Sequence, residues 1–150
     1  MAHIPIHARW YLADLVIEHI IDGDPRNIVH TNMHLVEADC PEQAYHKALA
    51  IGSESELIYA NTDGKEVRVV FRGLGSLSLI HEALEDGAEL AYSEEIAIPE
   101  AELKARLCAK EQLSVFAASP AKTGPNFMPA SVMRELDDAG FSHDDVRADK

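Results

Sequence analysis

The sequence predicts an α+β fold in which a mostly antiparallel sheet of about five strands carries one helix on a face. Three observations predict this class. Two strand-like runs open the chain around a short turn, a helix-like run follows, and later strand-like runs are separated by turns that contain Asp-Gly. The expected element order is therefore ββαβββ, followed by a C-terminal helix and a tail.

Length and composition fit one packed domain with an appendage. The 150 residues are 47% hydrophobic and 26% charged, which is typical of globular domains. A chain of this size can bury a core without cross-links. We assign residues 1–98 to the α+β domain, residues 99–118 to a C-terminal helix, and residues 119–150 to a linker, a short helix and a disordered tail.

The opening hairpin is the clearest element. Residues 10–21 are rich in β-branched and aromatic side chains, which favour a strand. Turn residues at 22–25 separate this run from a half-buried strand over 27–38. The odd positions of the first strand are apolar, whereas its even positions mix acidic and apolar side chains: Leu12, Asp14, Val16, Glu18 and Ile20. We therefore expect a central strand that is covered on both faces.

A helix is predicted over residues 40–51. Pro41 suits the first helical position, because its missing N–H has no partner there in any helix. Gln43 occupies the position from which a capping side chain reaches back to the backbone. We expect Gly52 to end this helix, since glycine readily adopts the positive φ of a C-terminal cap.

Three more strands follow in the prediction. Residues 61–64 carry a hairpin signal that joins a short strand over 56–60 to a return strand over 65–72. Gly73-Leu74-Gly75 is expected to break the return strand. The last strand is predicted over residues 89–98.

The C-terminal third is predicted to be helical and irregular. Residues 99–116 contain acid–base pairs at i,i+4 spacing, which support a helix. Three prolines and a glycine mark residues 119–129 as a linker. A short amphipathic helix over 130–139 and a disordered end over 142–150 complete the prediction.

The charge balance limits the classes of partner. The formal net charge is −13, which repels the phosphates of nucleic acids and the headgroups of anionic membranes. It favours either simple solubility or docking onto a basic protein. The chain shows no signal peptide, no membrane-length apolar run and no paired cysteines at metal-site spacing, so we expect a cytoplasmic protein with reduced Cys40 and Cys108.

The first hairpin also carries the best candidate site. Period-two geometry places Asp14 and Glu18 on one face of the first strand, and His30 and His34 on one face of the second. Centring the turn predicts Asp14 opposite His34 and Glu18 opposite His30. Two carboxylates and two imidazoles can hold zinc or a similar divalent ion, or act as acid and base. The alternative is a solvated face with charge-paired histidines. No residue is assigned a catalytic role.

The apolar side chains on the second face of the first strand need a cover. If they were exposed, they would form an apolar patch of a kind that monomers rarely leave open. Either the C-terminal helix or a symmetric partner chain can cover them, and two-fold homodimers are the commonest assembly. The expected partner is therefore a second copy of the chain, with a basic protein as a further possibility.

Several segments together resemble a known family. They are Trp10-Tyr11, residues 35–38 leading into Pro41-Glu42-Gln43-Ala44, residues 59–64, and Asp86-Gly87-Ala88-Glu89. Together they resemble a bacterial domain-of-unknown-function family, number 4288, over roughly residues 9 to 95. The resemblance implies a compact α+β domain and supplies no activity, ligand or catalytic residue.

The functional hypothesis is a non-enzymatic binding or interaction module that forms a homo-oligomer. Two alternatives remain open at this point. One is a small metal-dependent or acid–base enzyme that uses the face of Asp14, Glu18, His30 and His34. The other is an acidic inhibitor of a basic protein, which requires the acidic side chains to gather on one face.

Overall fold

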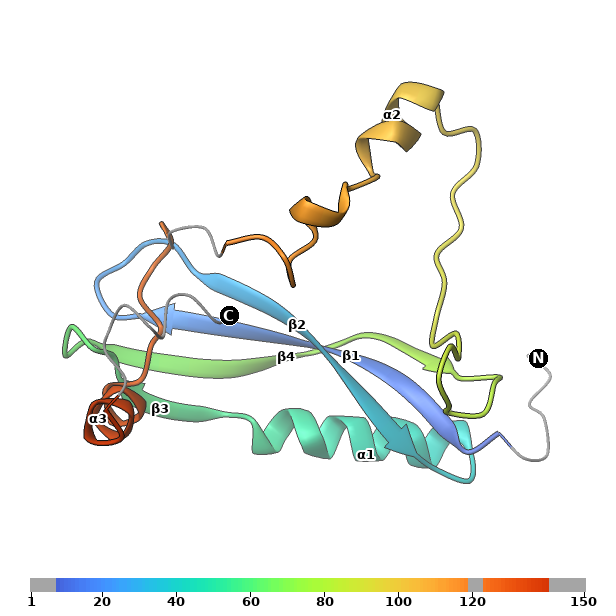
Figure 1. Ribbon diagram of the computed structural model, residues 1–150. Coiled ribbons are helices and arrows are strands. Elements are labelled where there is room, and N and C mark those ends of the chain that lie inside the picture. Colours follow the sequence, from blue (N-terminus) through green and yellow to red (C-terminus); the bar gives the residue numbers. More distant parts are fainter. Residues whose placement is uncertain (1–7, 119–122, 141–150) are drawn as a thin grey trace. The chain divides into compact units, whose positions relative to one another are not determined.

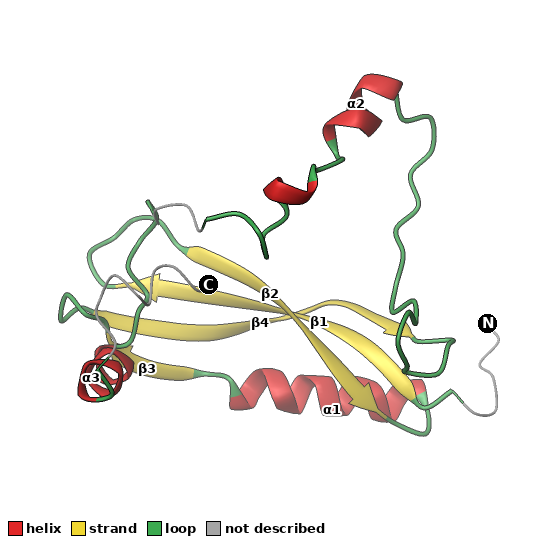
Figure 2. Cartoon of the chain, viewed as in Figure 1, coloured by secondary structure: helices red, strands yellow, loops and turns green. Residues whose placement is uncertain are grey.

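The computed structural model describes residues 8–118 and 123–140 and has the predicted α+β class (Figure 1 and Figure 2). The described chain divides into two units. The first contains residues 8–92 together with 125–129, and the second contains the other described residues. The first unit holds the sheet and its main helix.

One antiparallel sheet of four strands forms the first unit. The strands are β1 (Trp10–Ile21), β2 (Ile28–Glu37), β3 (Leu57–Ala60) and β4 (Glu66–Leu79), in the spatial order β2-β1-β4-β3. Strand β1 therefore pairs with a neighbour on each side. The element order of this unit is ββαββ rather than the predicted ββαβββ.

The difference in strand number comes from two segments. Strand β4 continues to Leu79, and the glycines Gly73 and Gly75 lie where its register against β1 shifts instead of ending it. Gly73 has a φ of 132°, a conformation that glycine adopts without strain. Because β1 presents a long pairing edge, β4 gains hydrogen bonds by continuing past the bulges. The predicted strand over residues 89–98 is wrong, since that segment pairs with no strand.

Helix α1 (Pro41–Glu54) follows β2. Pro41 occupies the first helical position, as predicted. The Gln43 side chain reaches back past the N-cap Cys40 and accepts a hydrogen bond from the Asp39 N–H at 2.7 Å, one residue before the partner that a capping box uses. The helix does not end at Gly52. This glycine lies inside the last turns and is buried. The ring of Phe71 occupies the space that a Cβ would need, which explains why the residue at this position is glycine.

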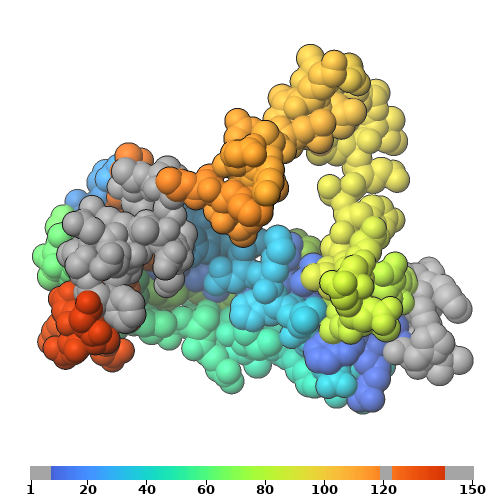
Figure 3. Space-filling model, in the orientation of Figure 1, coloured from blue at the N-terminus to red at the C-terminus, as the bar shows by residue number. Residues whose placement is uncertain are grey.

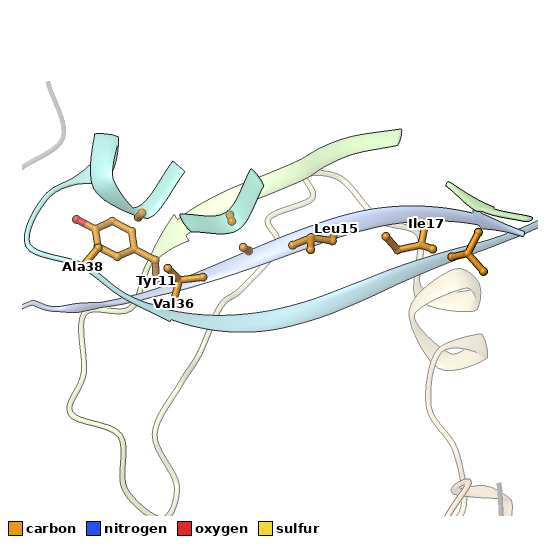
Figure 4. Packing of buried hydrophobic residues seen from close by; sticks show 9 residues of the cluster. Tyr11, Leu15, Ile17, Val36 and Ala38 are labelled. Carbon is orange, nitrogen blue, oxygen red and sulfur yellow. The ribbon is translucent and has the colours of Figure 1, made fainter. Parts of the chain in front are cut away.

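The core lies between α1 and the odd-numbered face of β1. Every second residue of β1 is buried, and α1 presents the small side chains of Ala44 and Ala48. Figure 4 shows the side chains of this cluster between the helix and the strands. The cluster consists of Tyr11, Ala13, Leu15, Ile17, Val36, Ala38, Ala44, Ala48 and Val69. We call this side of the sheet the helix face, and the opposite side the open face.

A returning segment packs onto the end of the first unit that carries β3. Residues 125–129, which the sequence predicts to be part of a linker, belong to the first unit. The Asn61 side-chain amide donates to the Asn126 carbonyl at 2.8 Å, and the Tyr59 hydroxyl donates to the Phe127 carbonyl. Asn61 is itself buried, and its side-chain oxygen accepts two backbone N–H groups of its own turn. The buried asparagine thus joins the hairpin turn to this segment.

The second unit contains short helices. They are α2 (Glu100–Ala105), the 3₁₀ helix η1 (Lys110–Gln112) and α3 (Ala130–Asp138). The single helix predicted over residues 99–116 is broken after α2, which buries none of its side chains. The predicted i,i+4 ion pairs do form, but such pairs add only a few tenths of a kcal/mol and do not hold a helix together. None of the described helices is long and apolar enough to cross a membrane. The end predicted to be disordered lies outside the described residues.

The contact between Gly52 and Phe71 gives the first prediction. Replacing an interior helical glycine by alanine usually stabilises a protein by about 0.5–1 kcal/mol. A Cβ at Gly52 would lie 2.5 Å from ring atoms of Phe71, so we expect Gly52→Ala to lower the free energy of unfolding by about 1–3 kcal/mol. Urea denaturation measures this change.

Two variants control the measurement. Ser53→Ala lies on the exposed side of the same helix and should change stability by no more than about 0.5 kcal/mol. In a Phe71→Leu background the cost of Gly52→Ala should shrink, because the obstructing ring is gone. An increase in stability for Gly52→Ala alone would contradict the proposed contact.

Candidate functional site

The four residues predicted to form a site do not share a face. The pairing of β1 with β2 sets Ala13 opposite His34 and Ile17 opposite His30. The predicted pairing of Asp14 with His34 and of Glu18 with His30 is therefore wrong by one residue. Because paired residues point to the same side of a sheet, the two histidines lie on the helix face and the two carboxylates on the open face.

The carboxylates have different surroundings. Glu18 accepts a hydrogen bond from the Asn27 side chain at 2.8 Å and lies 3.5 Å from the Arg72 guanidinium. One carboxylate oxygen of Asp14 is buried and has no hydrogen-bond partner among the described residues. Within residues 8–118 and 123–140, no group of three or more His, Cys, Asp or Glu side chains lies close enough to hold a metal ion. The predicted four-residue metal centre is not assembled by this register.

The helix face instead brings His30 next to a histidine that the sequence pattern did not connect with it. The rings of His19 and His30 are 4.6 Å apart, and Phe127 lies 5.5 Å from the first and 5.3 Å from the second. His19 pairs with Ile28 in the register, so His30 is its diagonal neighbour across the strands. The one-residue error in register concealed this contact, and the position of Phe127 depends on the returning segment.

Burial sets the charge state of His19. The residue is only 8% exposed, and its Nδ1 atom is buried with no hydrogen-bond partner in the described structure. Burial lowers the pKa of His19 below its ordinary value, and the neighbouring His30 lowers it further, while a hydrogen bond with the Ile28 backbone acts in the opposite direction. The imidazole of His19 is therefore neutral at neutral pH.

The open face carries a surface of apolar side chains. Four of them are more than two-fifths exposed: Val29 at 54%, Met33 at 68%, Leu35 at 46% and Ile58 at 62%. The even-numbered apolar residues of β1 lie between these side chains on the same face and are half-buried; they are Trp10, Leu12, Val16 and Ile20. We call these eight residues the open-face patch. Neither α1 nor residues 125–129 cover it, because both pack on the helix face.

Few charges lie on the open face, and they are of both signs. The register places Asp14, Glu18, Glu37 and Glu66 there, together with Arg68 and Arg72. The face therefore holds four acidic and two basic side chains, of the 26 acidic and 13 basic ones in the chain. Two residues of β4, Gly73 and Gly75, have no side chain, so no side chain projects from that part of the face. A Cβ at Gly73 would meet no atom within 4 Å.

The buried His19 gives a prediction about pH. The unfolded chain takes up a proton at His19 near its ordinary pKa of 6.5, whereas the folded protein does so only at lower pH. In that window the unfolded state binds more protons, so the free energy of unfolding should fall as the pH drops.

Denaturation at pH values from about 7.5 to about 5 measures the effect. His19→Phe should flatten the curve in this range, whereas substitution of the exposed His81 by glutamine should leave it unchanged. If stability rose as the pH drops, with the same slope in the wild type, in His19→Phe and in the His81 control, this assignment would be contradicted.

Comparisons with known proteins agree with the boundaries of the first unit. The family model described as "Domain of unknown function (DUF4288)" matches residues 10–93, a span that contains all four strands and α1. A search of curated proteins found no match. A search of solved structures likewise found none. The match covers more than half of the chain and ends next to the last residue of the unit's continuous part, Tyr92. The chain therefore belongs to the DUF4288 family of domains of unknown function.

Proposed function

We propose that this protein is a non-enzymatic binding module that forms a homodimer through the open-face patch. The observation that supports this proposal is the set of exposed apolar side chains on one side of a sheet whose other side is packed. Contiguous apolar surface of this kind is typical of interaction sites. Two antiparallel sheets commonly pack face to face at about 10 Å, with their side chains interdigitating.

The gain from covering this face is large enough to drive association. Removing one exposed Met, Leu, Val or Ile side chain from water contributes about 1.5–3 kcal/mol. Strands β2 and β3 alone supply four such side chains, Val29, Met33, Leu35 and Ile58. A symmetric dimer buries this set of side chains from both copies, so the contribution is doubled. The free energy gained by burying these side chains therefore opposes the cost of losing rotational and translational freedom on association.

The distribution of charge favours a second copy as the occupant. Two chains that each carry a net charge of −13 repel one another. They approach most easily through a surface that carries few charges of both signs, and the open face has this property. Its acidic and basic side chains also allow Asp14 and Glu18 of one copy to face Arg68 and Arg72 of the other. A donor from a second copy would satisfy the unpartnered oxygen of Asp14.

The same distribution argues against the two other functions considered from the sequence. An inhibitor of a basic protein needs acidic side chains gathered on its docking surface, and on the open face the few acidic side chains are interspersed with two arginines. An enzyme that uses Asp14, Glu18, His30 and His34 needs all four around one substrate, and the sheet separates the carboxylates from the imidazoles.

Sedimentation equilibrium over a wide range of protein concentration tests the proposal. We expect the wild type to reach twice the mass of one chain. Met33→Glu combined with Leu35→Glu should give a folded monomer, because the new charges lie in the buried interface. Added salt should strengthen the wild-type dimer, since it screens the repulsion between the two acidic chains.

The matched control is Asn32→Glu. It adds a negative charge to the same strand, one where the double variant adds two, but its side chain points to the helix face, so the dimer should persist. A wild type that stays monomeric at every concentration would overturn the proposal. If Met33 in such a monomer also resisted oxidation, another part of the same chain would be the occupant. Equal loss of the dimer in the control and in the double variant would also contradict the assigned surface.

A further inference from the structure

A hollow lies on the helix face at the end of the first unit where β1 begins. It has a volume of about 570 Å³, which is in the range of small-molecule sites. Its walls come from the start of α1 at Pro41, the end of β4, and the segment that follows β4. The Ile80 N–H donates to the Trp10 carbonyl at 2.9 Å and ties the beginning of that segment to β1. In Figure 3 the segment after β4 is coloured yellow-green and lies beside the blue start of β1.

The hydroxyl group of Tyr11 gives this hollow a specific polar group. Tyr11 lines the hollow and is only 3% exposed, and its hydroxyl is buried with no hydrogen-bond partner among residues 8–118 and 123–140. Figure 4 shows the Tyr11 ring beside the first turn of α1. A buried hydroxyl without a partner is costly, so a ligand that supplies a partner gains from this position. Burial and the nearby Cys40 raise the pKa of Tyr11, so the group stays a neutral hydroxyl.

The charged side chains of the hollow are acidic. Glu82 and Glu89 are in its wall, and the described residues that line it include neither lysine nor arginine. Glu82 accepts a hydrogen bond from the Glu89 backbone N–H at 3.0 Å, which closes the turn that carries both carboxylates. No ion pair joins either carboxylate to a described basic side chain. The strongly acidic chain also raises the local concentration of cations.

Most of the remaining wall is apolar and aromatic, and Ser78 and His81 add two polar side chains. Leu77, Leu79 and Leu90 contribute aliphatic surface, and Tyr92 contributes a ring that is 79% exposed. Aliphatic side chains suit the carbon skeleton of a ligand. An exposed aromatic ring attracts cations through its face. The lining thus combines apolar side chains, two carboxylates, the side chains of Ser78 and His81, and the Tyr11 hydroxyl.

We propose that this hollow binds a small organic cation, a primary amine on an apolar skeleton. The ammonium group pairs with Glu82 and Glu89, the skeleton lies on the leucines, and the Tyr11 hydroxyl forms a hydrogen bond with the ligand. The site lies on the helix face, within the span of the family match. It is separate from the open-face patch, so it does not depend on the proposed dimer.

Two probes with the same skeleton and opposite charge test this proposal. We expect 2-phenylethylamine to shift the backbone NMR signals of residues that line the hollow, and 3-phenylpropanoate to bind at least tenfold more weakly. Glu89→Gln should weaken binding of the amine about threefold, as expected for one solvent-accessible ion pair. Glu66→Gln, a carboxylate on exposed β4 surface away from the hollow, should have no effect.

Tyr11→Phe separates a binding role from a structural one. The change removes a buried hydroxyl that has no partner in the free protein, so the free variant should melt at the same temperature as the wild type or higher. Its affinity for the amine should nevertheless fall about fivefold. Equal binding of the two probes, absence of shifts in the lining residues, or unchanged affinity in Tyr11→Phe would each overturn the proposal. The variant Met33→Glu/Leu35→Glu should bind the amine as the wild type does, whatever its oligomeric state.

Discussion

The close approach of α1 to the sheet is the contact on which the rest of the structure depends. Ala44, Ala48 and Gly52 recur every four residues and form the buried stripe of the helix, so its backbone comes near the strands. Ala13 is fully buried beneath it, and the ring of Phe71 occupies the space beside Gly52. Larger side chains along this stripe would lift the helix from β1. The core between α1 and the helix face would then be exposed to water.

Strand β1 divides the molecule into two chemically different faces. It pairs along its length with β2 and β4, and its alternating burial assigns every side chain to one face or the other. One face is filled by α1 and by residues 125–129. The other keeps apolar side chains exposed and carries few charges. Within the first unit only one side of the sheet is covered, and this is the physical origin of the proposed dimer surface. The hollow by Tyr11 marks where the cover of the helix face is incomplete.

Most of the first unit follows from local patterns, whereas the candidate site does not. The first hairpin, the start of α1 at Pro41 and the turn at residues 61–64 depend on side chains that are close in sequence. The metal-site hypothesis depended on register, and a shift of one residue exchanges the two faces of a strand. The contact of His19 with His30 and the packing of Phe127 required partners that are distant in the chain. No pattern among residues that are close in sequence indicates such contacts.

Composition and short spacings were enough to predict the α+β class, the acidity, the opening hairpin and the resemblance to the DUF4288 family. The packing of distant residues was needed to establish that Gly52 is a packing residue rather than a helix end. It also decided that β4 continues through Gly73 and Gly75, and that Asp14 and Glu18 lie on the face opposite to His30 and His34. The physical reason is the same in each case. A residue's role depended on which atoms from another element occupied the space beside it.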